Sequence, residues 1–287
     1  MGERSYLRLV QKIIKSGVNE KGRNGITRVC IGETMRFCLT NRKMPLLTTK
    51  KMAWKTCLRE LLWFISGDTN NETLRKQNVT IWDGNAGDLA RFNNNPDIRY
   101  RDTNDLGPIY GFQWRHFGEK YVNSETAYSG QDQLQNIINH LKKKEDNRRL
   151  IMSAWNPTQL GEMALPPCHV LSQFHITNGD ELSCSLYQRS GDVGLGVPFN
   201  IASFSFLTHL LAHHCDLKPK EFIHHIGNAH IYDDHLEILE KQLNEDIKVP
   251  PILHIKNHKD NIEDYDVDDF AIKYYTSAKK LKMKMRI

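Results

Sequence analysis

Apolar residues recur at the 3.6-residue period of an α-helix in three segments of this chain, residues 54–66, 134–141 and 201–215. In the first segment the periodic positions are Cys57, Leu58, Leu61, Leu62 and Ile65. Gly67 follows directly and is a natural stop for a helix. The third segment is almost continuously apolar and ends before Pro219, which predicts a buried helix.

Other segments carry the pattern of β-strands. Residues 149–155 form one predicted strand, and residues 168–177 and 181–189 form two more. The last two are separated by Asn178-Gly179-Asp180, which is a strong hairpin signal. These strands lie between the predicted helices, so the two kinds of element are mixed along the chain.

The second arm of that hairpin shows which side of the strand faces the interior. Leu182, Cys184 and Leu186 alternate with polar residues, which predicts one buried and one polar face. Residues 84–104 break all periodicity and are predicted to form a loop. Helices mixed with hairpin-linked strands predict a single α+β domain over residues 1–287.

Composition and charge narrow the class of protein. The 287 residues are 39% hydrophobic and 25% charged, as in an ordinary globular protein that needs no metal or disulfide for stability. A net charge of +5 suits an anionic partner such as a phosphorylated metabolite, but it is too small to specify nucleic acid. No apolar run approaches about 18 residues, so no membrane-spanning helix is expected.

The six cysteines show neither a CxxC pair nor a short regular spacing. That pattern argues against a zinc ribbon and against a disulfide framework. The first residues, Met1 to Tyr6, contain no apolar leader segment. We therefore expect free thiols and a location in the cytoplasm or the nucleus.

Candidate chemistry centres on Cys168, which follows Pro166-Pro167 and precedes a predicted strand. A single free cysteine is more often a small core residue. A thiol becomes a nucleophile where positive charge stabilises its thiolate, however, and arginines recur nearby at Arg148, Arg149 and Arg189. Arg148 and Arg149 directly precede a strand, where two arginines can hold a phosphate dianion through charge-assisted hydrogen bonds. An ordinary pair of surface arginines is the alternative.

A polar, glycine-rich segment spans residues 188–200 and does not match the GxGxxG pattern of dinucleotide folds. Its glycines permit close approach of a ligand to the backbone. Asn200 offers a donor and an acceptor side by side, which match the N–H and C=O edge of a uracil ring. The alternative role for Asn200 is to cap the helix that follows.

Three further residues have weaker signals. Glu60 lies inside the first apolar helix, where it either faces solvent or faces a closed site that would raise its pKa and allow proton transfer near neutral pH. His230 and Tyr232 would share one face of a strand and could both donate to a sugar hydroxyl. The histidine doublets elsewhere cannot place both rings on one helical face, so no metal site is expected.

As a set, these residues resemble one family, thymidylate synthase, over nearly the whole chain. The matching segments, in order, are residues 45–50, 60–67, 106–118, 148–157, 165–169, 188–203 and 230–232. Each segment is short, but their joint occurrence in this order is very specific. The resemblance implies helices packed on a large mixed β-sheet, and a homodimer packed sheet against sheet.

The resemblance also implies a methyltransferase of dTMP biosynthesis that converts dUMP and 5,10-methylenetetrahydrofolate to dTMP and dihydrofolate. Cys168 would attack carbon 6 of dUMP and so make carbon 5 a nucleophile. The implied catalytic residues are Cys168, Glu60, Tyr110, Asp192 and Asn200. The folate would be a cosubstrate that carries out the redox step, so that neither a nicotinamide nor a metal is needed.

The remaining implied roles divide between the two ligands. The implied dUMP-binding residues are Arg23, Arg148, Arg149, Gln188, Arg189, Ser190, Gly191, Asp192, Asn200, His230, Ile231 and Tyr232. Among them Arg148 and Arg149 would reach the phosphate of the partner subunit. The implied folate-binding residues are Lys50, Ile81, Trp82, Asp192, Leu195, Gly196, Phe199 and Arg286.

Three positions depart from the family pattern. The segment around Arg23 is one residue shorter than the usual phosphate-binding loop, Asn228 replaces an acidic residue, and Arg286 stands where a small residue is common. Because the tail folds over the ligands in this family, Arg286 bears on how the site closes.

The alternative on the same fold is a dUMP hydroxymethylase, in which water rather than hydride ends the reaction. An Asp would be expected in place of Asn200 for an enzyme acting on dCMP. A Cys-His acyl-transfer enzyme would explain neither the arginines nor Asn200. The basic segment 279–286 leaves RNA binding as a secondary activity, although a solvated chain end is the simpler interpretation.

Overall fold

The computed structural model describes residues 2–22, 24–86, 101–145 and 148–286. Within these ranges the α-helices are α1 (Glu3–Ser16), α2 (Trp54–Ile65), α3 (Asn71–Lys76), α4 (Tyr110–His116), α5 (Gln133–Lys142), α6 (Gly196–His214) and α7 (Leu236–Gln242). The β-strands are β1 (Val18–Gly22), β2 (Gly25–Cys38), β3 (Ile151–Ser153), β4 (His169–Thr177), β5 (Glu181–Asp192), β6 (Lys218–Tyr232), β7 (Ile252–Ile255) and β8 (Phe270–Lys273). The predicted α+β class is confirmed.

One six-stranded sheet carries most of the strands, in the order β1-β2-β6-β5-β4-β3. The sheet is mixed, because β5 and β6 run parallel while the other neighbours are antiparallel. The register of the parallel pair sets Asp192 opposite His230 at the carboxyl ends of both strands. Two segments that lie far apart in the sequence therefore end side by side.

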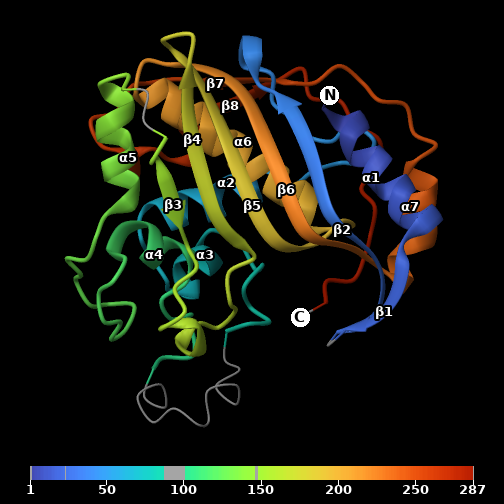
Figure 1. Cartoon of the computed structure of the whole chain (residues 1–287), viewed down its shortest axis with the longest axis horizontal. Coiled ribbons are helices and arrows are strands. Elements are labelled where there is room, and N and C mark those ends of the chain that lie inside the picture. The colour runs from blue at the N-terminus through green and yellow to red at the C-terminus, as the bar shows by residue number, and fades with distance from the viewer. Residues whose placement is uncertain (1, 23, 87–100, 146–147, 287) are drawn as a thin grey trace.

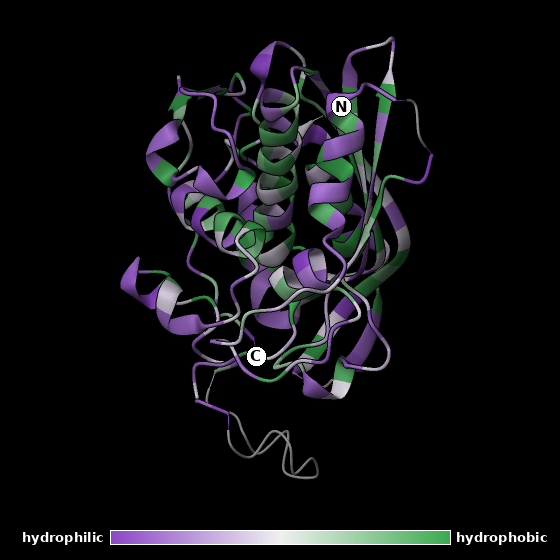
Figure 2. Cartoon of the chain, turned by 90° about the vertical axis from the view of Figure 1, so that its left-hand side faces the viewer, coloured by the Kyte–Doolittle hydropathy of each residue, from purple (hydrophilic) through white to green (hydrophobic). Residues whose placement is uncertain are grey.

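The helices cover one face of this sheet, with α6 and α2 behind β4, β5 and β6 (Figure 1). Seen from the side, the strands form one layer and the helices form the other (Figure 2). Alternation along the strands points Tyr187 and Ile151 toward the uncovered face, where they are 44% and 45% exposed. No described helix packs on that face.

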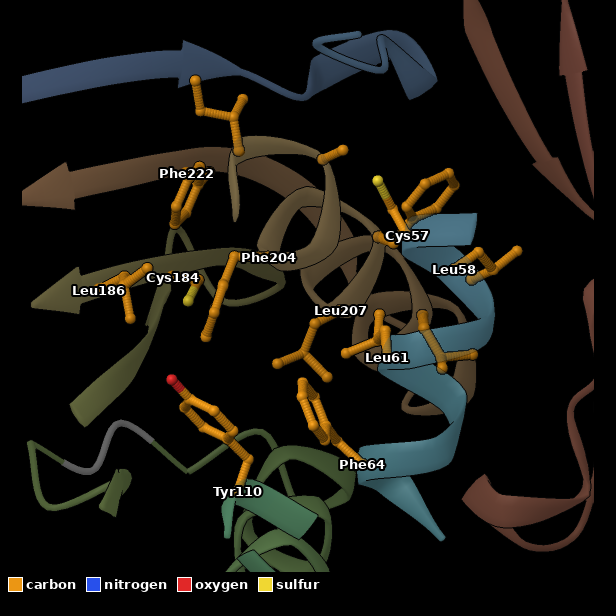
Figure 3. Close-up of a cluster of buried hydrophobic side chains, with 14 of the residues drawn as sticks. Cys57, Leu58, Leu61, Phe64, Tyr110, Cys184, Leu186, Phe204, Leu207 and Phe222 are labelled. Carbon is orange, nitrogen blue, oxygen red and sulfur yellow. The ribbon is translucent and has the colours of Figure 1, made fainter. Parts of the chain in front are cut away.

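The core lies between the sheet and α6, which is buried along nearly its whole length. Phe204 and Leu207 of α6 meet Phe64 of α2 and Phe222 of β6 there (Figure 3). The rings of Phe204 and Phe222 stack at 6.0 Å. No helix among the described residues is both long and apolar enough to cross a membrane.

The predicted elements were recovered with two corrections. The helices predicted over residues 54–66 and 134–141 and the hairpin were found where expected, and Leu182, Cys184 and Leu186 are fully buried. The strand predicted over 149–155 was too long, since only Ile151–Ser153 pair with β4. In the predicted loop 84–104, residues 87–100 lie outside the described ranges.

The second correction concerns the start of the buried helix. It was predicted at residue 201, but α6 begins at Gly196. Residues 188–200 were interpreted as a polar, glycine-rich segment ahead of the helix, yet Pro198 lies in the first turn of α6, where its missing N–H costs nothing. Asn200 therefore lies inside the helix and does not cap it, which removes that alternative role.

Candidate functional site

A cavity of about 1400 Å³ opens at the carboxyl ends of the parallel strands β5 and β6. Its walls also include parts of β1, β2, α2, α4, α6 and the C-terminal tail, which we define as residues 276–286. Ligand sites usually occupy about 300–1,000 Å³. The volume is therefore large enough for two small molecules side by side.

Most of the residues singled out from the sequence line this one cavity. They are Lys50, Glu60, Ile81, Trp82, Tyr110, Cys168, Gln188, Arg189, Ser190, Gly191, Asp192, Leu195, Gly196, Phe199, Asn200, His230, Tyr232 and Arg286. Arg148 and Arg149 do not line it, and both are exposed just before β3. Ile231 is fully buried, on the opposite face of β6 from His230 and Tyr232. Arg23 lies outside the described residues.

Cys168 is held in place by the arginine next to it. The Arg189 side chain donates from Nε to the Pro167 carbonyl at 2.9 Å and from Nη2 to the Pro166 carbonyl at 2.8 Å. The backbone N–H of Cys168 donates to the Tyr110 hydroxyl at 2.7 Å. Burial raises the pKa of the Cys168 thiol above 9.0, although Arg189 and Tyr110 act in the opposite direction. The thiol is therefore protonated at neutral pH, and its proton must leave before or as it attacks.

A chain of three side chains fixes the orientation of the Asn200 amide. The Ser190 carbonyl can only accept, so the Gln188 atom 2.8 Å from it is the Nε2 donor. The same nitrogen donates to Asn200 Oδ1 at 2.9 Å, while Gln188 Oε1 lies 2.8 Å from Nε2 of His224. Burial lowers the pKa of His224 to about 3, so the ring is neutral and its proton is on Nε2. Asn200 thus has an amide with one orientation, as hydrogen-bond readout of a pyrimidine requires.

Glu60 faces the cavity from α2 and does not face bulk solvent. The Trp82 indole N–H donates to Glu60 Oε1 at 2.8 Å. Burial raises the pKa of Glu60 to about 7, although the bond from Trp82 acts to lower it. Burial also raises the pKa of the nearby Tyr110 hydroxyl well above 10.0. Glu60 can therefore exchange a proton near neutral pH, whereas Tyr110 stays protonated.

The opposite wall is built around the turn after β5. Asp192 Oδ1 accepts from the backbone N–H of Gly194 at 2.8 Å and of Leu195 at 3.3 Å. The Lys50 ammonium donates to the Gly194 carbonyl. Burial lowers the pKa of Lys50 to about 8, against the opposing charges of Asp192 and Glu3. Lys50 thus supports this turn from inside the protein.

The N-terminal helix α1 contacts both the segment that carries Lys50 and the turn after β5. The Glu3 carboxylate accepts hydrogen bonds of 2.6 to 2.9 Å from the backbone N–H and hydroxyl groups of Thr48 and Thr49. One turn later in α1, the Tyr6 hydroxyl donates to the Val193 carbonyl at 3.0 Å. Helix α1 therefore positions Lys50 and the Asp192 turn relative to each other.

The C-terminal tail lines one side of the cavity and is fixed by side chains that follow β6. Arg286 Nη2 lies 2.8 Å from Asp234 Oδ2, and its guanidinium sits 5.7 Å from the centre of the Tyr232 ring. His235 Nε2 lies 2.9 Å from the Lys284 carbonyl. The acidic pair Asp233-Asp234 is the sequence signal that could have predicted a partner for Arg286.

Sequence reasoning missed three histidines at this site. His169 lines the cavity, and its ring packs 5.1 Å from Tyr110 and 5.0 Å from Phe204. Burial lowers the pKa of His169 to about 4, so it is neutral at pH 7. Its place beside Cys168 was the available signal, whereas nothing local distinguished His224 or His235 from the other histidines. No group of His, Cys, Asp and Glu within the described ranges is arranged to hold a metal ion.

The fold and the site together define a class of protein: an α+β protein with a cysteine (Cys168), an arginine (Arg189) and an amide of fixed orientation (Asn200) in one cavity. Comparison with known proteins makes the assignment specific. The model of the thymidylate synthase family matches residues 4–287, so the chain belongs to that family.

Individual relatives agree with the family match. Human thymidylate synthase is 48% identical over 289 residues, which cover 100% of this chain and 91% of the human protein. The bifunctional dihydrofolate reductase-thymidylate synthase of Zea mays is 48% identical, and bifunctional enzyme 2 of Arabidopsis thaliana is 50% identical. Those matches cover 99% and 98% of this chain but only 54% and 50% of the relatives. The chain thus spans about half the length of these bifunctional proteins.

Proposed function

We propose that this protein is a thymidylate synthase, which converts dUMP and 5,10-methylenetetrahydrofolate to dTMP and dihydrofolate. The observation that carries the proposal is the joint presence of Cys168, Arg189 and the oriented Asn200 in one cavity. Membership of the family and the human relative of nearly equal length support it.

Cys168 would act as the nucleophile in this reaction. Its sulfur forms a bond to carbon 6 of the uracil, and the electron pair of the 5,6 double bond moves toward carbon 5 and the carbonyl oxygen at carbon 4. The Nδ2 donor of Asn200 stabilises the negative charge on that oxygen. Glu60, with a pKa of about 7, is suited to the proton transfers that follow, and Tyr110 would act with it.

The dUMP site would follow the carboxyl ends of β5 and β6. Arg189 and Ser190 would hold the phosphate, while Asn200 and Gln188 would hold the base. His230 and Tyr232 share one face of β6 and line the same cavity, as ribose ligands would have to. The oriented amide favours uracil over cytosine, because cytosine reverses the donor and acceptor on that edge.

The folate would lie against the other wall, and the residues there fit its chemistry. Trp82, Leu195 and Phe199 supply apolar surface for a flat ring system, and Asp192 supplies a carboxylate. Ile81, Gly196, Lys50 and Arg286 complete this side of the cavity. When bound, the folate supplies the transferred carbon and the hydride.

We further propose that two copies of the chain pair through the uncovered face of the sheet. That face carries the exposed side chains of Tyr187 and Ile151, and a sheet face of this kind is commonly covered by another layer. Arg148 and Arg149 are exposed close to it and would contribute to the partner's phosphate site. Sedimentation of the wild type would test the pairing. The cytoplasm or the nucleus is the proposed location, which imaging of the tagged protein would test.

A turnover assay with dUMP and 5,10-methylenetetrahydrofolate tests the reaction. Dihydrofolate is followed by absorbance and the nucleotide product by mass. Formation of dTMP with an equal amount of dihydrofolate would support the proposal. A hydroxymethyl product without dihydrofolate would instead identify the hydroxymethylase, which the names of the relatives do not favour.

A further inference from the structure

His235 lies between the C-terminal tail and Asp192, and it is fully buried. It ends the short helix η5 (Asp233–His235) that follows β6. Its Nε2 lies 2.9 Å from the Lys284 carbonyl, and its Nδ1 lies 3.8 Å from Asp192 Oδ1. Among the described residues, Nδ1 has no hydrogen-bond partner. The imidazole of His235 therefore faces the tail on one side and the Asp192 carboxylate on the other.

Simple hydrogen-bond chemistry assigns one of the two ring protons. A backbone carbonyl can only accept, so Nε2 carries a proton toward Lys284 in every protonation state. Nδ1 carries either a second proton, which attracts the Asp192 carboxylate, or a lone pair, which repels it. The strength of the link between the tail and Asp192 thus depends on the charge of the ring.

The charged groups around the ring favour the doubly protonated form. Asp192 faces Nδ1 from β5, and Asp234 of η5 lies 3.8 Å from Nε2, although Arg286 of the tail pairs with Asp234. Lys50 lies on the far side of the Asp192 turn. Burial acts to lower the pKa of His235, but the nearby carboxylate of Asp192, the hydrogen-bonded Lys284 carbonyl and the charge of Asp234 together raise it above 6.5.

We infer that His235 is a positioning residue that couples the tail to the Asp192 turn and so sets how firmly the tail covers the cavity. Asp192 also accepts from the backbone N–H groups of Gly194 and Leu195, so the whole turn moves with that carboxylate. The tail and this turn form one unit, joined by the imidazole. For the folate, this inference rests on the proposed function; for the tail, it does not.

The sign of the pH dependence follows from the raised pKa. The attraction between the imidazolium and Asp192 is complete below pH 6.5 and is lost as pH rises through the higher pKa of the folded protein. The bond from Nε2 to the Lys284 carbonyl remains. We therefore expect the tail to open more often, and the KM for the folate to rise, as pH increases above 6.5.

Two matched variants of His235 test separately its contact with Lys284 through Nε2 and its contact with Asp192 through Nδ1. In His235→Gln the amide nitrogen reaches the position of Nε2, so the bond to Lys284 is kept while titration is removed. In His235→Asn the shorter amide reaches only the position of Nδ1, so contact with Lys284 is lost. Melting curves by circular dichroism show that each variant is folded before it is compared.

The first readout is trypsin cleavage in the tail, which contains Lys280, Lys282, Lys284 and Arg286 and needs no catalytic activity. Rates are measured by intact mass from about pH 6 to about pH 9, relative to a free peptide of residues 276–287. We expect relative cleavage of the wild type to increase with pH, and that of His235→Gln to stay constant. His235→Asn should be cleaved about tenfold faster than wild type at low pH, as loss of one buried hydrogen bond predicts.

The second readout is the KM for each ligand. We expect the KM for 5,10-methylenetetrahydrofolate to follow tail cleavage in both variants, while the KM for dUMP stays within about twofold of the wild-type value. A pH dependence of cleavage in His235→Gln equal to that of the wild type would overturn the inference. So would a wild-type tail cleaved at a pH-independent relative rate, or equal increases in both KM values. Wild-type protein without turnover would refute the proposed function alone, because cleavage still tests the coupling.

Discussion

The wall of the cavity that lies on the sheet and the C-terminal tail that lines another side are built in different ways. The wall that carries Cys168, Arg189 and Asn200 is fixed by backbone hydrogen bonds along β4, β5 and β6 and by the long buried helix α6. Among the described residues, the tail makes backbone hydrogen bonds to the rest of the protein only near its start, where Ala278 donates to the Thr48 carbonyl at 2.8 Å and the Lys279 carbonyl accepts from Lys51 at 3.4 Å. Its far end is held by the side chains of His235 and Asp234.

This difference predicts an order of events. The wall on the sheet is complete before any ligand arrives, so the nucleotide should bind to it without rearrangement. Side-chain contacts that cover only the end of a tail open easily, because few buried apolar groups have to separate. The folate would therefore bind second and be enclosed by the tail.

The largest effect should come from the sheet wall, at the nucleophile. Cys168→Ala should lower turnover by at least about 10³-fold, because no covalent bond to carbon 6 can form. Binding of dUMP should remain measurable by calorimetry, since Arg189 and Asn200 are unchanged. Residual turnover close to that of the wild type would show that Cys168 is not the nucleophile.

Glu60→Gln tests the side chain that is expected to transfer protons in the cavity. Turnover should fall by about 10²-fold, and the change in kcat near pH 7 expected from the Glu60 pKa of about 7 should disappear. Gln still accepts the bond from Trp82, so that contact serves as an internal control. If the pH profile of the variant matches the wild type, another group carries the proton.

The same variant has a second, thermodynamic signature. The pKa of Glu60 is raised in the folded protein from 4.5 to about 7, so its charged form destabilises the fold as pH rises through that window. Glu60→Gln should therefore match the wild type near pH 4 and be more stable by about 1–3 kcal/mol above pH 7, after allowance for water in the cavity. Urea denaturation at several pH values measures this difference.

Asn200→Asp tests whether the Asn200 amide distinguishes uracil from cytosine. Gln188 still donates to the new carboxylate, but that carboxylate can also accept from the exocyclic amine of cytosine. The preference for dUMP over dCMP should fall by about tenfold or more, as measured by competitive inhibition. An unchanged preference would mean that the oriented amide does not read the base.

The smallest effect is expected at the tail. Arg286→Ala removes a partly exposed ion pair with Asp234, so the KM for the folate should rise by about two- to fivefold while that for dUMP is unchanged. Arg286→Lys keeps the charge and serves as the matched control. Added salt should reduce the difference between wild type and Arg286→Ala, because screening weakens exposed pairs.

The contrast between the walls also explains what could be predicted from the sequence. The periodic helices and the Asn178-Gly179 hairpin are local signals, and they were recovered. Cys168, Arg189 and Asn200, singled out by their side chains and by the family resemblance, line one cavity, and their roles stay predictions. Gly196 and Pro198 concealed the start of α6, because local propensity gives way to burial of a whole helix.

What could not be predicted depends on contacts distant in the sequence. His224 orients Asn200 only because β5 and β6 are parallel neighbours, and His235 meets Lys284 only because the tail folds back. Lys50 lines the cavity, and no local pattern indicated that its ammonium would bond to the Gly194 carbonyl. A single sequence contains no local pattern for such pairs.

The bond from Tyr6 to Val193 has a consequence for synthesis of the protein. It joins residues 187 positions apart, so a growing chain cannot form it until about two thirds of its residues have left the ribosome. Contacts over such separations form slowly, because a long loop must close first. The candidate cavity is therefore among the later parts of the molecule to form, and under the proposed function dUMP would stabilise only chains in which it has formed.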